Sequence, residues 1–231
     1  MKLAVITAHY GADSLSQAVL SWGGATPLFI QDGSSGMLPA YDKGWRRARD
    51  HGYTILAHLH DDVLIHEPHW EKRVLREFED PQVGLVGFGG ALAHGDPQMY
   101  RVPYEYYQLG RSHFRSNMVD AEVHGERFTG ECDVAVLDGF ALIVRRSILE
   151  SAGGWPRDTP INYVGYDYFL SCITRRLGYR IRLVGVQCAH LGGRTFVKQG
   201  IGQDAKHWQE YLAAHQYIYS EFRDVLPWSV T

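Results

Sequence analysis

Short apolar runs alternate with helical stretches along most of this chain, and the alternation limits the folds open to it. The apolar runs lie at 2–10, 26–36, 53–60 and 83–90, and stretches with helical spacing follow the first three at 13–22, 42–52 and 67–80. Strands that alternate with helices pair in parallel through right-handed crossovers. The sequence therefore predicts an α/β fold with a mostly parallel central sheet flanked by helices.

The alternation fails in one place. Segment 91–131 is rich in Tyr, His and Arg and has no long apolar period, so we expect a binding surface there that selects a second substrate. Regular patterns return after it, and 203–223 has the apolar spacing of a C-terminal helix that packs on the body. A chain of 231 residues suits a single core, so we expect one domain over 1–231.

Composition excludes several classes of protein. With 45% hydrophobic and 21% charged residues the chain matches soluble globular proteins, and a net charge of −3 gives no general attraction to nucleic acid or anionic lipid. The first apolar run is too short for a signal peptide and no apolar stretch is long enough to span a membrane, so we expect a cytoplasmic protein. Three scattered cysteines argue against a disulfide framework and a structural zinc site.

Acidic and histidine residues follow the predicted strands at their carboxyl ends, where ligands of open α/β sheets bind. They are Asp32, the pair Asp61 and Asp62, Asp138, and His190. Asp167 begins a predicted helix, where free amides also stabilise a carboxylate. Together they indicate a site for a cation and a ligand. Each also has an ordinary alternative: a turn residue, a solvated strand end, a helix cap or a buried core histidine.

The order of these motifs resembles the GT-A glycosyltransferases of the family 2 type, in the branch with an HQDV-like metal motif. The matching stretches are "QDGSS" at 31–35, "HDDV" at 60–63, "VLDGF" at 136–140, "GYDYF" at 165–169 and "CAHLGG" at 188–193. The resemblance covers about 3–90 and 132–197. It implies a GT-A fold and an enzyme that moves a sugar from a nucleotide-sugar donor to an acceptor hydroxyl.

The resemblance also implies roles for particular residues. Asp62 and His190 would hold a metal ion, and Asp167 would be the catalytic base. Contacts to the nucleotide sugar would come from Thr7, Ala8, Tyr10, Asp32, Asp61, Asp138, Gly139 and Arg194. The sequence departs from the family pattern at two positions, because the first acid of the metal motif is His60 and the base motif begins with Tyr166.

Chemistry narrows these implied roles. Carboxylate and imidazole ligands together suit Mn²⁺ better than Mg²⁺. Asp32 could accept the ring N–H of uracil or thymine, so UDP- and dTDP-sugars are the favoured donors, with UDP-sugars preferred. In an inverting displacement, Asp167 would take the proton of the attacking hydroxyl. The expected acceptor is a saccharide, a lipid-linked glycan or a small molecule, and a modified DNA base is conceivable because arginines cluster at 46–49 and at 111 and 115.

Two other functions remain open from the sequence. "HLHDD" at 58–62 is close to the metal motif of zinc hydrolases, although Val63 stands where the final histidine of that motif belongs. A nucleotide-sugar-binding module without turnover would need the same fold. Zinc content separates the first alternative from the transferase, and donor hydrolysis without acceptor separates the second.

Overall fold

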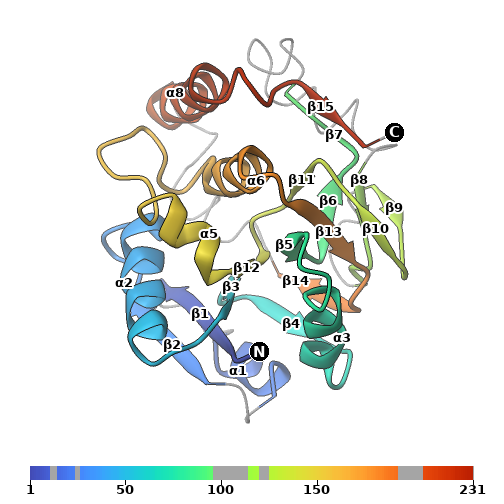
Figure 1. Ribbon diagram of the computed structural model, residues 1–231. Helices are drawn as coiled ribbons and strands as arrows, with labels where there is room; N and C mark the ends of the chain where they lie inside the picture. The colour runs from blue at the N-terminus through green and yellow to red at the C-terminus, as the bar shows by residue number, and fades with distance from the viewer. Residues whose placement is uncertain (11–14, 24–26, 96–113, 120–124, 192–204, 231) are drawn as a thin grey trace.

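The structure, a computed structural model, describes residues 1–10, 15–23, 27–95, 114–119, 125–191 and 205–230. Within these ranges the chain forms a mixed α/β fold whose largest sheet runs through the middle of the molecule with helices around it (Figure 1). The fold class predicted from the alternation of strands and helices is confirmed.

The central sheet has seven strands among the described residues, in the order β10-β13-β5-β12-β3-β1-β2. Their bounds are β1 Leu3–His9, β2 Leu28–Asp32, β3 Ile55–Leu59, β5 Val83–Gly87, β10 Glu131–Asp133, β12 Ala141–Arg145 and β13 Arg180–Val184. Five strands run in one direction, as predicted, while β12, inserted between β3 and β5, and the edge strand β10 run the other way. The carboxyl ends of β1, β2 and β3 therefore share one edge.

The helices of the described residues lie around this sheet. They are α1 Leu15–Ser21, α2 Met37–Asp50, α3 Trp70–Glu77, α5 Arg146–Ser151, α6 Tyr166–Arg176 and α8 Ala205–Glu221. Helix α2 contacts β1 and β2, and a side chain at Gly44 would place its Cβ 2.3 Å from Cγ2 of Ile6. In the described part of the chain, no helix is both long enough and apolar enough to cross a membrane.

Segment 91–131 takes part in regular structure where it is described. Strands β6 Gly89–Ala91, β8 Phe114–Ser116, β9 Glu126–Arg127 and β11 Val136–Leu137 form a small sheet, and β7 Ala93–His94 pairs with β15 Trp228–Ser229. Strands of two or three residues are too short to show an alternation of apolar and polar side chains, so the sequence pattern could not reveal them.

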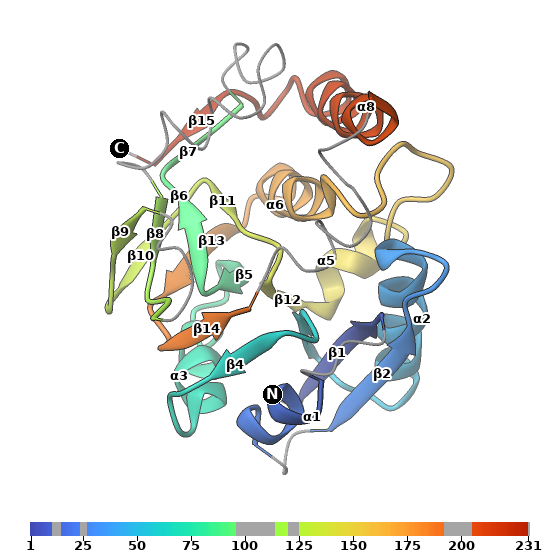
Figure 2. The same cartoon turned by 180° about the vertical axis from the view of Figure 1, so that it is seen from behind.

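The apolar stretch 179–190 forms two strands that belong to different sheets. The chain leaves the central sheet after β13, turns at Gly185, and forms β14 Cys188–His190 in a separate ribbon with β4 Val63–Ile65. The ribbon is antiparallel and pairs His190 with Val63 (Figure 2). A Cβ at Gly185 would lie 2.2 Å from the carbonyl oxygen of Phe128, so only glycine fits this turn. The ribbon brings His190 beside the acids that follow β3.

The C-terminal helix, expected at 203–223, spans Ala205–Glu221, and residues 203 and 204 lie outside the described residues. It packs against α6: the ring of the fully buried Phe222 lies 5.7 Å from that of Phe169, centroid to centroid. Arg176 of α6 donates hydrogen bonds to the carboxylate of Asp224. Buried apolar side chains form one contiguous cluster from Leu3 to Leu226 in the described part of the chain.

Candidate active site

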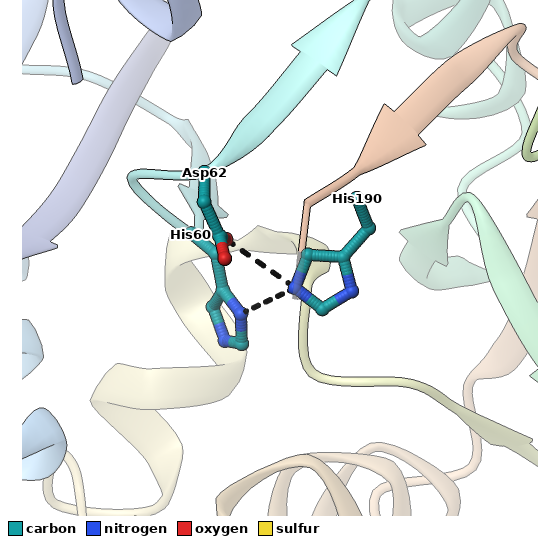
Figure 3. A group of neighbouring side chains, drawn as sticks. All are labelled: His60, Asp62 and His190. Carbon is teal, nitrogen blue, oxygen red and sulfur yellow. Dashed lines mark hydrogen bonds and ion pairs between the residues drawn. The ribbon is translucent and has the colours of Figure 1, made fainter. Parts of the chain in front are cut away.

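Asp62 and His190, the two residues predicted to hold a metal ion, lie side by side. Asp62 sits in the turn between β3 and β4, and His190 ends β14, which pairs with β4. His190 Nε2 lies 3.3 Å from Asp62 Oδ1, and the backbone N–H of Leu191 donates to the carbonyl oxygen of Asp62. The ribbon therefore fixes both side chains on the same edge of the central sheet (Figure 3).

A third side chain, His60, points into the same space. His60 Nδ1 lies 3.3 Å from His190 Nε2, and the ligand atoms of His60, Asp62 and His190 all lie within 4.8 Å of one another. We call these three residues the His60 cluster. The sequence prediction did not assign His60 to the metal site, although its spacing of two residues from Asp62 was a signal that both could face one ion.

The charges of the cluster support cation binding. Burial favours the neutral form of Asp62, but the hydrogen bond and charge of His190 outweigh it and lower the pKa of Asp62. Burial would lower the pKa of His190, but the hydrogen bond and the charge of the Asp62 carboxylate outweigh it, so the pKa of His190 is raised. Burial, with the charge of His190, lowers the pKa of His60 to about 4, so this imidazole is neutral at pH 7. One carboxylate and two imidazoles are a donor set that divalent transition ions accept, so the residues fit a metal ion.

Asp61 faces away from the cluster and joins the ends of two strands. Its Oδ2 accepts a hydrogen bond from the backbone N–H of Tyr10 and lies 3.1 Å from His9 Nδ1. Thr7 and Ala8, which the resemblance placed in the nucleotide pocket, are buried inside the sheet. The partly exposed side chains at this end of β1 belong to His9 and Tyr10. His9 has no counterpart in the sequence prediction, because nothing in the sequence indicates its contact with Asp61.

Asp32 is exposed at the end of β2 and forms the turn that the sequence left open as its alternative. Its carboxylate accepts hydrogen bonds from the backbone N–H and the hydroxyl of Ser34, at 2.8 and 2.9 Å. These bonds, the backbone one first, lower the pKa of Asp32. Gly33 packs under the ring of Tyr10, where a Cβ would lie 2.6 Å from a ring carbon. The turn thus holds an ionised carboxylate next to an aromatic ring.

Asp167 lies in the first turn of α6 beside a second acid. Its Oδ1 accepts a hydrogen bond from the backbone N–H of Tyr168 at 2.9 Å, and the backbone N–H of Gly139 donates to the same carboxylate. Burial, followed by the nearby charge of Asp138, raises the pKa of Asp167 to about 7. Both acids line a pocket with Phe114 of the small sheet. A carboxylate with this pKa suits proton transfer at neutral pH.

Tyr166 connects the two parts of the site. Its hydroxyl lies 2.6 Å from His60 Nε2, and its chain neighbour is Asp167. A Cβ at Gly139 would lie 2.1 Å from the Tyr166 hydroxyl oxygen. Gly139 is expected from the resemblance to contact the nucleotide sugar, and in the structure the tyrosine hydroxyl fills the space where its Cβ would lie. Arg194, expected to contact the diphosphate, lies outside the described residues.

Comparison with known proteins supports one family. Residues 25–218 match the family described as "Glycosyltransferase like family". No curated protein sequence matches the chain significantly. The match confirms the predicted family and the predicted class of enzyme, a glycosyltransferase with a GT-A fold.

Solved structures also resemble the chain. The crystal structure of A197 from STIV matches at a TM-score of 0.50 and 13% identity, over 80% of this chain and 82% of that one, which is a likeness of fold alone. The mannosyltransferase PcManGT from Pyrobaculum calidifontis, in complex with GDP-Man and Mn²⁺, matches at a TM-score of 0.46 and 18% identity; the match covers 93% of this chain and 60% of that one. On the match over 25–218, the chain belongs to the glycosyltransferase-like family.

Proposed function

We propose that this protein transfers a sugar from a UDP-sugar donor to an acceptor hydroxyl, with inversion at the anomeric carbon, and that it depends on a divalent metal ion, preferably Mn²⁺. The observation that carries the proposal is the pairing of Asp62 with His190 at one end of a site whose other end holds Asp167, a partly buried carboxylate with a pKa raised to about 7.

Asp62 and His190 would hold the metal ion. When bound there, the ion supplies Lewis-acid chemistry that neutralises charge on the departing diphosphate. The protein's own contribution is to fix both ligands through the β4–β14 ribbon. Asp61 would act indirectly. Its carboxylate links the end of β3 to Tyr10 and so shapes the surface that would contact the nucleoside.

Asp167 is the base in this proposal. A hydroxyl that attacks the anomeric carbon must lose its proton, and a carboxylate with a pKa near the working pH accepts it most effectively. Asp138 lines the same pocket and would accept hydrogen bonds from the hydroxyls of the transferred sugar. Apolar side chains, among them Phe114 and Val136, line the rest of the pocket.

Asp32 supports UDP as the nucleotide. Its carboxylate is ionised and exposed at the edge of the site, and each oxygen keeps a lone pair beyond its bond to Ser34. Such an oxygen can accept the ring N–H of uracil. For the acceptor we propose a saccharide, a lipid-linked glycan or a small molecule.

A DNA acceptor has less support. Three of the arginines that could contact phosphates, Arg46, Arg49 and Arg115, are paired with acidic side chains. The arginine at 111 lies outside the described residues.

The zinc hydrolase alternative is also less well supported by the geometry. Its motif requires His58 as a ligand beside His60, but His58 is fully buried between Tyr41 and Trp155, with ring centroids at 4.8 and 5.2 Å. Its ring therefore packs in the core, away from the His60 cluster.

A thermal-shift panel of UDP-, GDP-, dTDP- and CMP-sugars, each with and without Mn²⁺, tests the proposal. At about 100 times its dissociation constant a ligand adds about 2.7 kcal/mol of stability. For a chain of this size we expect a rise in Tm of about 5 to 10 °C with UDP-sugar and Mn²⁺ together. A rise in Tm with the sugar of another nucleotide contradicts the proposed donor. An equal rise in Tm with and without Mn²⁺ contradicts the metal dependence. Release of UDP from the donor without acceptor excludes a binding module that lacks turnover.

A further inference from the structure

We propose that His60 is a third ligand of the metal ion and that Tyr166 is a positioning residue, which holds His60 in the tautomer that can bind it. The inference rests on the proposed function, since it adds a ligand to the same ion. It adds a second imidazole to the Asp62 carboxylate and the His190 imidazole, and so makes the enzyme selective for transition metals over Mg²⁺.

The separations of the donor atoms agree with this assignment. Around an ion with ligand bonds of about 2.1 Å, neighbouring donor atoms lie about 3.0 to 3.5 Å apart. His60 Nδ1 and His190 Nε2 are 3.3 Å apart, and His190 Nε2 and Asp62 Oδ1 are also 3.3 Å apart. Figure 3 shows the three side chains converging from the β3 end and from β14. In the sequence, His60 stands where the family's metal motif has its first acid.

The contact with Tyr166 determines which nitrogen of His60 is free. Histidines that bind metals donate their second ring N–H to a fixed partner, and this contact selects the tautomer. The phenol oxygen of Tyr166, 2.6 Å from His60 Nε2, can accept that hydrogen bond. Nδ1 then carries a lone pair and faces His190. The tyrosine is itself buried, and its hydroxyl rests against Gly139, so the partner cannot turn away.

The donor set determines which metals bind well. Mg²⁺ prefers oxygen ligands, whereas imidazole suits the transition metals. We therefore expect the protein to bind Mn²⁺ and Co²⁺ far more tightly than Mg²⁺. His60→Asp restores the carboxylate of the family pattern, so it should narrow the ratio of Mn²⁺ to Mg²⁺ affinity by about tenfold or more.

Direct metal titration of the full chain tests the inference without reference to turnover. Mn²⁺ binding is followed by the electron paramagnetic resonance signal of free Mn²⁺, and Mg²⁺ binding by calorimetry. We expect His60→Ala and His60→Asn to weaken Mn²⁺ binding by about 100-fold, and Tyr166→Phe by about tenfold, in the range of losses seen when partners of metal ligands are removed. His51→Ala, at the exposed end of α2, is the matched control and should bind as the wild type does.

The outcomes distinguish a failure of this inference from a failure of the proposed function on which it rests. If the wild type binds no Mn²⁺, both fail. If Asp62→Ala abolishes binding while folded His60→Ala and His60→Asn keep wild-type affinity, His60 is not a ligand and the metal-dependent function stands. Tyr166→Phe should raise the metal concentration needed for half-maximal activity while kcat at saturating Mn²⁺ stays within about twofold. A fall in kcat and Tm with unchanged metal affinity assigns Tyr166 a structural role and overturns its part of the proposal.

Discussion

Asp167 is the residue whose protonation should control turnover. As a base it must be deprotonated, and its pKa is raised to about 7 by burial and by Asp138. We therefore expect kcat to rise with pH through 7 and level off above pH 8; at pH 5 only about 1% of the carboxylate is ionised, so the rate should be about 100-fold lower. The pH profile of kcat at saturating donor and metal measures this.

Asp167→Asn should remove the base without emptying its place. Because the amide oxygen can still accept the hydrogen bonds from the backbone of Tyr168 and Gly139, the fold and donor binding should persist. Removal of a general base costs about 10² to 10⁴ in turnover, and the rise in kcat through pH 7 should vanish with it. A variant with normal turnover would exclude Asp167 from the role.

The same residue should make stability depend on pH. The pKa of Asp167 is about 7 in the folded protein and about 3.9 in the unfolded chain, so the folded state binds more protons between these values. Its contribution to stability is therefore present below pH 4 and is lost as pH rises to 7. Relative to the wild type, Asp167→Asn should gain several degrees in Tm between pH 4 and pH 8. Tm is measured across this pH range for the wild type, for Asp167→Asn and for Asp50→Asn, a control at an exposed position that should show no such gain.

At the scale of the elements, the β4–β14 ribbon positions the site. Its return strand is set by the turn at Gly185, where a Cβ would meet the backbone oxygen of Phe128 at 2.2 Å. Gly185→Ala must therefore shift backbone, and we expect a loss of about 1 to 3 kcal/mol in stability and weaker Mn²⁺ binding, since His190 follows five residues later.

Gly52→Ala is the matched control for this turn. It introduces the same methyl group at a backbone φ of 77°, where the substitution is strained but no atom lies within 4 Å of the new Cβ. It should lower stability by about 1 kcal/mol and leave Mn²⁺ binding unchanged. Equal metal affinity in both variants contradicts a positioning role for the turn.

The ribbon also explains how far the sequence could predict this site. The strand ends after β1, β2 and β3 follow from local patterns, and in the structure Asp32, Asp61 and Asp62 lie at the ends of β2 and β3. The contacts of His60 with Tyr166 and His190 join residues 106 and 130 positions apart. Nothing local encodes such contacts, because they depend on three-residue strands and on a glycine turn that folds the chain back.

At the scale of the whole molecule, helix α6 connects the C-terminal helix α8 to the candidate active site. Helix α6 carries Tyr166 and Asp167 in its first turn, and it contacts the tail through Phe169, one turn into the helix, and through Arg176 at its far end. Damage to the tail contact should therefore loosen the helix that carries Asp167, the proposed base. Helix α6 therefore contributes both to the packing of the tail and to the position of Tyr166 and Asp167.

Phe222→Ala tests whether the chain is one domain. The side chain is fully buried, so its removal should cost about 3 to 5 kcal/mol. Trp208 and Trp228 lie in the tail, so both are replaced by Phe in the two proteins compared; the remaining tryptophans, Trp22, Trp45, Trp70 and Trp155, are buried in the part of the core that precedes α6, and fluorescence then reports on that part. If the chain unfolds as one unit, the urea midpoint followed by tryptophan fluorescence should fall as far as the midpoint followed by far-ultraviolet circular dichroism. A fluorescence midpoint that stays at its wild-type value, while the dichroism midpoint falls, would instead mean that the tail and α6 unfold apart from the sheet.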